Sequence, residues 1–81
     1  MNNKLTIQPI VRRNRINANN EIPIYLRIII NGKRSEFSTN LFIPENSWSS
    51  EKGKMKGNNE VAKTVNTHLD NLKLLASEKF S

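Results

Sequence analysis

A run of mostly β-branched and aliphatic residues, Ile22–Ile30, is the feature that most constrains the fold of this chain. Apolar side chains occupy alternate positions along it, which is the period of a β-strand with one buried face. Asn31-Gly32 follows at once, and both central positions of a two-residue type I′ turn require the positive φ angles that these residues adopt. The pattern predicts a β-hairpin in which 22–31 is the central strand of a sheet and 33–39 is the return strand.

The two-residue turn also fixes the register of the hairpin, and therefore which side chains share a face of the sheet. It is expected to pair Ile30 with Lys33, Ile28 with Ser35, Leu26 with Phe37 and Ile24 with Thr39. The face that carries these isoleucines, the leucine and the phenylalanine is apolar, so we expect it to be buried.

The opposite face of the hairpin has a different composition. Alternation along the two strands assigns to it Tyr25, Arg27, Ile29, Arg34, Glu36 and Ser38. Cations, hydrogen-bonding groups and apolar side chains are mixed there, which is not typical of an ordinary solvated surface.

The segments on either side of the hairpin complete the predicted sheet. Residues 5–13 alternate in the manner of a strand, and Pro9 requires an edge position or a bulge because it cannot donate a ladder hydrogen bond. Pro44 suits the start of a short helical turn, and Trp48 is expected to close an edge of the core. Residues 49–59 combine turn formers with lysines and are expected to form a surface loop.

Apolar residues at helical spacing predict a helix over 59–79, capped by Asn58 or Asn59. Its buried stripe is expected to hold Val61, Ala62, Val65, Leu69, Leu72, Leu75 and Ala76, with Leu74 pointing away from the sheet. The predicted fold class is α+β, with a three-stranded antiparallel β-sheet packed on one carboxy-terminal α-helix. We expect a single domain over 1–81.

The distribution of charge indicates the class of partner. The net charge is +6, and residues 1–34 account for all of it, with seven basic residues against one acid. Residues 35–81 are balanced, with six lysines against six acids. All five arginines lie in the first part, and the planar guanidinium pairs with phosphates and guanine edges in bidentate fashion. A polyanion is therefore the expected partner, although a high pI also simply maintains solubility.

The composition offers little for catalysis. A chain of this length buries only about 60% of its surface on folding, which argues against a deep cleft. It has no cysteine, and His68 is the single histidine, so we expect no disulfide, no metal site and no nucleophile beside a base. No enzyme activity and no cofactor are predicted. The start of the chain lacks an apolar secretory region and no apolar run could span a membrane, which predicts a soluble, cytoplasmic protein.

Candidate DNA-contacting residues follow from the charge and the predicted faces. Arg27 and Arg34 are expected to reach base edges or phosphates, although Arg27 could instead pair with Glu36 across the strands. The group Arg12, Arg13 and Arg15 is expected to contact phosphates. The candidate set is Arg12, Arg13, Arg15, Tyr25, Arg27, Lys33, Arg34, Glu36 and Ser38, while Lys52, Lys54 and Lys56 are left open between DNA contact and solvation.

Several segments together resemble a known family. They are Ile22-Pro-Ile-Tyr-Leu-Arg27, Asn31-Gly-Lys-Arg34, Phe37-Ser-Thr39, Pro44–Trp48 and Lys54-Met-Lys-Gly57, followed by the amphipathic helix. The set is similar, over residues 5–80, to the arm-type-site DNA-binding amino-terminal domain of tyrosine-recombinase integrases from phages and conjugative transposons. The resemblance implies a three-stranded antiparallel sheet with one helix, and binding of arm-type sites through the open face of the sheet. The chain departs from the family at Asn40, where glycine is usual.

The resemblance also implies that the chain is one domain of a longer integrase. A helical core-binding domain and a catalytic domain with an Arg/His/Arg constellation and a nucleophilic tyrosine would follow, so Tyr25 is not expected to be that nucleophile. The implied partners are double-stranded DNA and the downstream integrase domains, and the isolated domain is expected to be monomeric.

Two other functions share parts of this pattern. The same sheet face, with Tyr25 and Ile29 exposed, could dock on a partner protein or on another integrase domain, and the helix end near Leu74 and Phe80 could pack on the next domain. An RNA-binding domain would have a similar charge, but the chain lacks the pair of stacking aromatic residues expected of single-strand readers. Salt dependence separates DNA binding from apolar docking.

Overall fold

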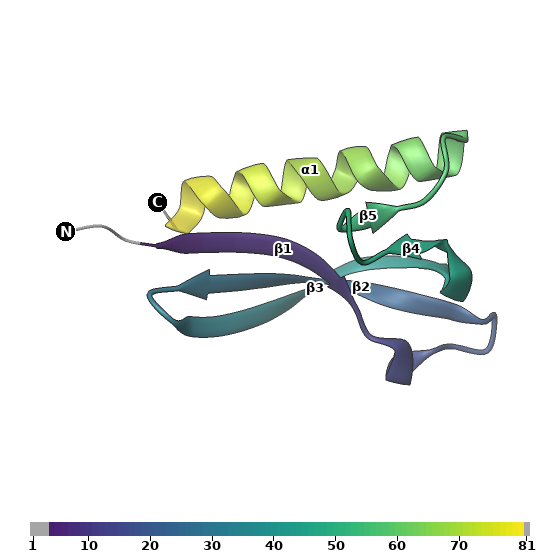
Figure 1. Cartoon of the computed structure of the whole chain (residues 1–81), viewed down its shortest axis with the longest axis horizontal. Helices are drawn as coiled ribbons and strands as arrows, with labels where there is room; N and C mark the ends of the chain where they lie inside the picture. The colour runs from purple at the N-terminus through teal and green to yellow at the C-terminus, as the bar shows by residue number, and fades with distance from the viewer. Residues whose placement is uncertain (1–3, 81) are drawn as a thin grey trace.

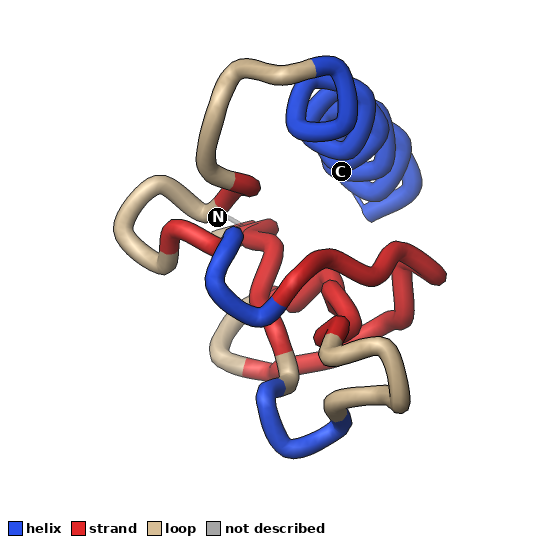
Figure 2. Tube along the Cα trace, turned by 90° about the vertical axis from the view of Figure 1, so that its right-hand side faces the viewer, coloured by secondary structure: helices blue, strands red, loops and turns tan. Residues whose placement is uncertain are grey.

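A three-stranded antiparallel sheet and one long helix dominate the computed structural model, which describes residues 4–80 (Figure 1). The strands are β1 (Leu5–Val11), β2 (Glu21–Ile30) and β3 (Lys33–Pro44), and the helix is α1 (Glu60–Phe80). The predicted α+β fold and the central position of β2 are confirmed. Viewed nearly along its axis, α1 lies on one side of the strands (Figure 2). None of the helices within residues 4–80 is long and apolar enough to cross a membrane.

The turn between β2 and β3 has the geometry that its sequence predicts. The φ angles of Asn31 and Gly32 are +50° and +85°, the left-handed values that a type I′ turn needs. Three of the predicted cross-strand pairs are formed, namely Ile30–Lys33, Ile28–Ser35 and Leu26–Phe37. This tight turn therefore sets the register of the adjoining half of the hairpin.

The fourth predicted pair is wrong, because a bulge interrupts the hairpin. Tyr25 pairs with Ser38, whereas Ile24 pairs with Leu41, so two additional residues lie on β3 between these pairs. Beyond the bulge the strand continues to Pro44, instead of ending at the predicted residue 39. The bulge keeps Ile24 on the buried face while it changes the partner of that residue.

The two bulge residues have complementary roles. Thr39 is buried, and its hydroxyl donates a hydrogen bond of 2.7 Å to the carbonyl oxygen of Ile24. Asn40 has a φ of +61°, a conformation that glycine adopts most easily and asparagine tolerates better than most residues. The asparagine that departs from the resembled family therefore occupies a backbone position suited to glycine.

The main core lies between the bulged end of the sheet and the first half of the helix. Its members are Ile22, Ile24, Ile43, Trp48, Met55, Ala62, Val65 and Leu69. Trp48 is only 4% exposed, which confirms its predicted place in the core. The sheet, the helix and the segment that connects them all contribute to this cluster.

The connecting segment is more ordered than its composition suggests. Instead of forming only a surface loop, it contains two short paired strands, β4 (Trp48–Ser49) and β5 (Lys54–Met55), preceded by the 3-10 helix η2 (Glu45–Ser47). Met55 is buried in the core, which corrects the prediction for residues 49–59. The short helical turn expected after Pro44 is confirmed.

Asn66 of α1 holds β5 against the helix. Its side-chain oxygen accepts a hydrogen bond of 2.9 Å from the backbone N–H of Met55, and its amide nitrogen donates one of 3.1 Å to the Met55 carbonyl. The Asn66 side chain thus forms with Met55 the two hydrogen bonds that the backbone of a neighbouring strand would form. The sequence analysis did not identify this role of Asn66.

Replacing Asn66 with alanine is expected to lower the free energy of unfolding by about 1–3 kcal/mol, because two part-buried backbone groups lose their partners. Asn71→Ala is the matched control, since Asn71 is exposed on the same helix. Thermal or urea denaturation measures both variants. Equal stability of the two variants would contradict the proposed role of the side chain.

The helix begins and packs largely as predicted. The side-chain oxygen of Asn59 accepts a hydrogen bond of 2.8 Å from the Ala62 N–H, which confirms Asn59 as the cap. Leu74 is exposed, also as predicted, but Val61 and Leu75 are 60% and 61% exposed and do not belong to the buried stripe. At 3.6 residues per turn they lie on the flank of a stripe that is narrower than expected.

Phe37 is on the predicted face of the sheet but is half exposed. The helix packs more closely on β1 than on β3, which leaves the β3 side of this face partly uncovered (Figure 1). An apolar groove results, lined by Leu26, Ile28, Phe37, Leu72, Leu75, Ala76 and Lys79. The predicted burial of Phe37 is therefore wrong, although its orientation is right.

Candidate nucleic-acid interface

The side of the sheet that faces away from α1 carries the candidate site. Leu26 and Ile28 face the helix, so the residues that alternate with them on β2, and their partners on β1 and β3, face the other way. We call this surface the open face; it consists of Thr6, Gln8, Ile10, Tyr25, Arg27, Ile29, Arg34, Glu36 and Ser38. Arg12, which follows β1, reaches the same surface.

Arg12 reaches the open face because the pairing of the first two strands continues past the end of β1. Its backbone N–H donates a hydrogen bond of 3.2 Å to the Pro23 carbonyl. The guanidinium carbon lies 5.9 Å from the centre of the Tyr25 ring, within the range of a cation–π contact.

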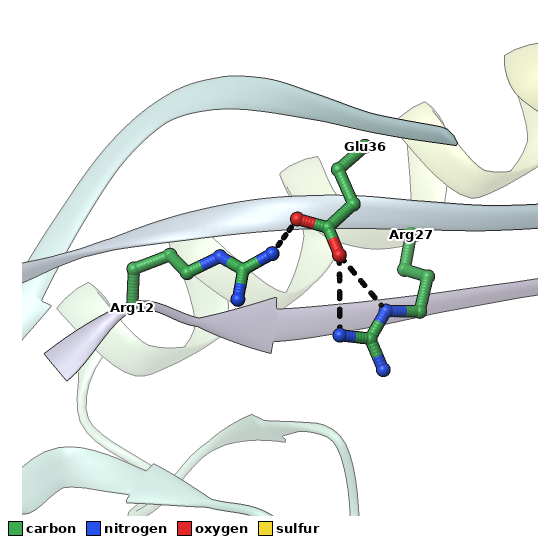
Figure 3. Close-up of polar contacts among 3 residues, drawn as sticks. All are labelled: Arg12, Arg27 and Glu36. Atoms are coloured by element: carbon green, nitrogen blue, oxygen red, sulfur yellow. Dashed lines mark hydrogen bonds and ion pairs between the residues drawn. The ribbon is translucent and has the colours of Figure 1, made fainter. Parts of the chain in front are cut away.

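Two arginines converge on one carboxylate in the middle of this face (Figure 3). Arg27 Nε donates a hydrogen bond of 3.1 Å to Glu36 Oε2, and Arg27 Nη2 forms an ion pair with the same oxygen, also at 3.1 Å. Arg12 forms an ion pair with the other oxygen of Glu36. The side chains of Arg27 and Glu36 are only 24% and 22% exposed. The cross-strand pair foreseen for Arg27 and Glu36 is therefore present, and Arg12 completes it.

The other candidate residues on this face differ in whether their side chains already form hydrogen bonds. Arg34 is exposed beside Ile29, and within residues 4–80 no ion pair or side-chain hydrogen bond of Arg34 is found. The hydroxyl of Ser38 accepts a hydrogen bond of 3.1 Å from the backbone N–H of Asn40, so it also braces the bulge. Of the two, Arg34 is the more accessible to a ligand.

The remaining basic candidates lie outside the open face. Arg13 and Arg15 belong to the 3-10 helix η1 (Arg13–Arg15), and Arg13 Nη1 donates a hydrogen bond of 2.9 Å to the Glu45 carbonyl. Arg15 is exposed. Lys33 pairs with Ile30 and faces the helix side of the sheet, so the structure does not bring it together with Arg34. The candidate lysines at 52, 54 and 56 are all exposed around the β4–β5 hairpin.

Comparison with known protein families decides the assignment. The model of the family described as "Arm DNA-binding domain" matches residues 9–81, which is nearly the whole chain. The chain belongs to the arm DNA-binding domain family. The resemblance to the arm-type DNA-binding amino-terminal domain of integrases is thereby confirmed. No curated protein sequence and no solved structure matches it significantly.

An arm DNA-binding domain is a non-catalytic DNA-binding domain. His68 is exposed on α1 beside Lys63, Thr64, Thr67 and Asn71. Among the described residues, no three histidine, cysteine, aspartate or glutamate side chains gather where they could hold a metal ion.

Sequence reasoning missed the part that β1 plays in the open face of this arm DNA-binding domain. Thr6, Gln8 and Ile10 lie opposite Ile29, Arg27 and Tyr25, respectively. The β1–β2 connection is long and contains η1, so no tight turn fixed this register in advance. The alternation of side chains along residues 5–11 was the sequence signal that could have placed these residues on one face of the sheet.

Proposed function

We propose that this domain binds double-stranded DNA sequence-specifically through the open face and positions a tyrosine-recombinase integrase on arm-type sites during DNA integration. One observation carries the proposal: Arg12, Arg27 and Arg34 gather on a sheet surface that the helix does not cover. Strands of a β-sheet can enter the major groove, where arginine donors can pair with guanine acceptors. Membership in the arm DNA-binding domain family supports the same assignment.

The proposed contacts fall into two classes. Arg27 and Arg34 would read base edges, with Tyr25 and Ser38 supplying further polar groups at the centre of the face. Arg13 and Arg15 would contact phosphates at its margins. Lys33 would contact a phosphate from the tip of the hairpin, because its side chain starts on the helix side of the sheet. The lysines at 52, 54 and 56 are placed in neither class. Glu36 and Arg12 belong to the central group through their ion pair.

Arg15→Ala is expected to weaken binding to every duplex alike, because a phosphate contact carries no sequence information. The slope of log K against log salt concentration should become shallower by about one unit for each lost phosphate contact. Fluorescence anisotropy at several salt concentrations measures this. A variant with an unchanged slope would remove Arg15 from the interface.

The parent domain provides the test of the proposal as a whole. Its affinity for a duplex carrying the terminal sequences of the mobile element should fall steeply as salt rises, because phosphate contacts release counterions. Apolar docking of the same face on a protein would give a weak salt dependence. An equally tight complex with single-stranded RNA would instead favour the RNA-binding alternative.

The rest of the proposed context concerns the parent protein. The domain would be the first part of a longer integrase, whose downstream domains would supply the catalytic residues, and it would act as a monomer in the cytoplasm. The arginine-bearing open face would then deliver these domains to DNA without any chemistry of its own.

A further inference from the structure

Glu36 places a carboxylate at the centre of a surface that is otherwise suited to a polyanion. It is the acidic member of the open face, and its charge would repel a phosphate that approached there. Its side chain is only 22% exposed, and both of its oxygens are paired with arginines. A DNA-binding surface retains such a group at a cost in affinity, and its contacts indicate what the group does.

The contacts of Glu36 constrain Arg27 in a particular orientation. Nε of Arg27 donates to Oε2 and Nη2 forms an ion pair with the same oxygen, so this edge of the guanidinium faces the carboxylate. A guanidinium has five N–H donors in a fixed plane. Its outer edge carries one N–H of Nη1 and the second N–H of Nη2, and this carboxylate does not use these two donors. Two parallel donors on one edge match the O6 and N7 acceptors that guanine presents in the major groove.

Arg12 holds the carboxylate from its other side. It pairs with Oε1 (Figure 3). Its guanidinium carbon lies 5.9 Å from the centre of the Tyr25 ring. Both carboxylate oxygens are therefore engaged, and the three charged side chains fix one another. Neither arginine needs to lose much additional side-chain freedom when DNA binds.

We propose that Glu36 is a positioning and specificity residue, which presents the free edge of Arg27 to a guanine and keeps phosphates away from the centre of the open face. The inference rests on the proposed function, since it concerns the same surface. It commits the binding site to a G·C pair beneath Arg27. A cross-strand pair with a purely structural role would affect folding stability and leave base discrimination unchanged.

The test begins with the 81-residue chain and a library of random-sequence duplexes. Selection yields a bound sequence, and anisotropy then compares this selected duplex with a scrambled one. The variants are Glu36→Gln, which removes the charge, and Glu36→Asp, which keeps the charge but is one methylene shorter. Asp70→Asn is the matched control, because it makes the same charge change at an exposed helix position away from the open face.

For Glu36→Gln we expect the ratio of the two affinities to fall about tenfold, which is typical of one bidentate base contact. The scrambled duplex should bind more tightly, with a salt slope steeper by about one unit. Glu36→Asp should lose discrimination without that gain in salt-dependent affinity. Asp70→Asn should keep the parent ratio.

The parent chain also gives a readout that needs no variant. Replacing the critical guanine of the selected duplex with 7-deazaguanine removes the N7 acceptor, and the parent should bind this duplex about tenfold more weakly. If no selected guanine responds, or if Glu36→Gln tightens both duplexes by the same factor, the positioning role of Glu36 is refuted. A parent that binds no duplex at all would instead overturn the proposed function.

Discussion

Arg27→Ala and Arg34→Ala are each expected to weaken binding to the cognate arm duplex by about 1–3 kcal/mol, and to weaken binding to a scrambled duplex much less. The reason is their position on adjacent strands of the open face, where both side chains can reach the edges of bases. Specificity should fall together with affinity. Anisotropy on the two duplexes measures both quantities.

The effect of Arg27→Ala requires a control for its ion pair. The substitution also releases Glu36, which would then repel DNA through an unpaired carboxylate. The double variant Arg27→Ala/Glu36→Gln removes this repulsion, and it should recover affinity for any duplex without recovering specificity. Lys63→Ala, on the exposed side of the helix, is the control for a loss of charge alone. Unchanged affinity in both arginine variants, with native spectra, would move the DNA site away from this face.

Trp48→Ala is expected to destabilise the domain by about 3–5 kcal/mol, because it removes a large buried side chain from the core. A small domain has a free energy of unfolding of only about 5–15 kcal/mol, so this variant should be largely unfolded or close to it. Leu26→Ala should cost about 2–3 kcal/mol, since Leu26 is buried but borders the apolar groove.

Phe37→Ala is the control for these core substitutions. Phe37 is also apolar and faces the helix, yet it is half exposed, so its loss should cost clearly less than that of Trp48. Thermal denaturation followed by circular dichroism ranks the variants. A melting temperature for Trp48→Ala close to that of the parent would show that the core is assigned wrongly.

Local signals in the sequence predicted the parts of the fold that depend on neighbouring residues. Asn31-Gly32 determined the turn and the nearby register, because its backbone requirement is met by those two residues alone. For the same reason Asn58 and Asn59 could be identified as candidate caps, of which Asn59 forms the cap. The bulge at residues 39–40 could not, since it depends on how the far end of β3 packs against the core.

Burial depended on packing that the sequence does not specify. Alternation oriented Phe37 correctly, but its exposure follows from the position of α1 over β1. The pairing of β5 with Trp48 and Asn66 could not be predicted from the sequence, because the Lys/Gly-rich segment that contains β5 is too short and polar to indicate a strand. On the open face, the Arg27–Glu36 pair could be predicted from the hairpin register. The contact of Arg12 with Glu36 could not, because its prediction also requires the β1–β2 register.

An NMR titration of the labelled domain with its arm duplex tests the central claim most directly. The side-chain Nε–H signals of Arg12, Arg27 and Arg34 can be followed individually together with the backbone amides. Binding through the open face predicts that these three signals shift or broaden at low salt, while the signals of Leu75 and Lys79 beside the apolar groove remain in place. Shifts confined to the groove and the helix, with the three arginine signals unchanged, would contradict the account.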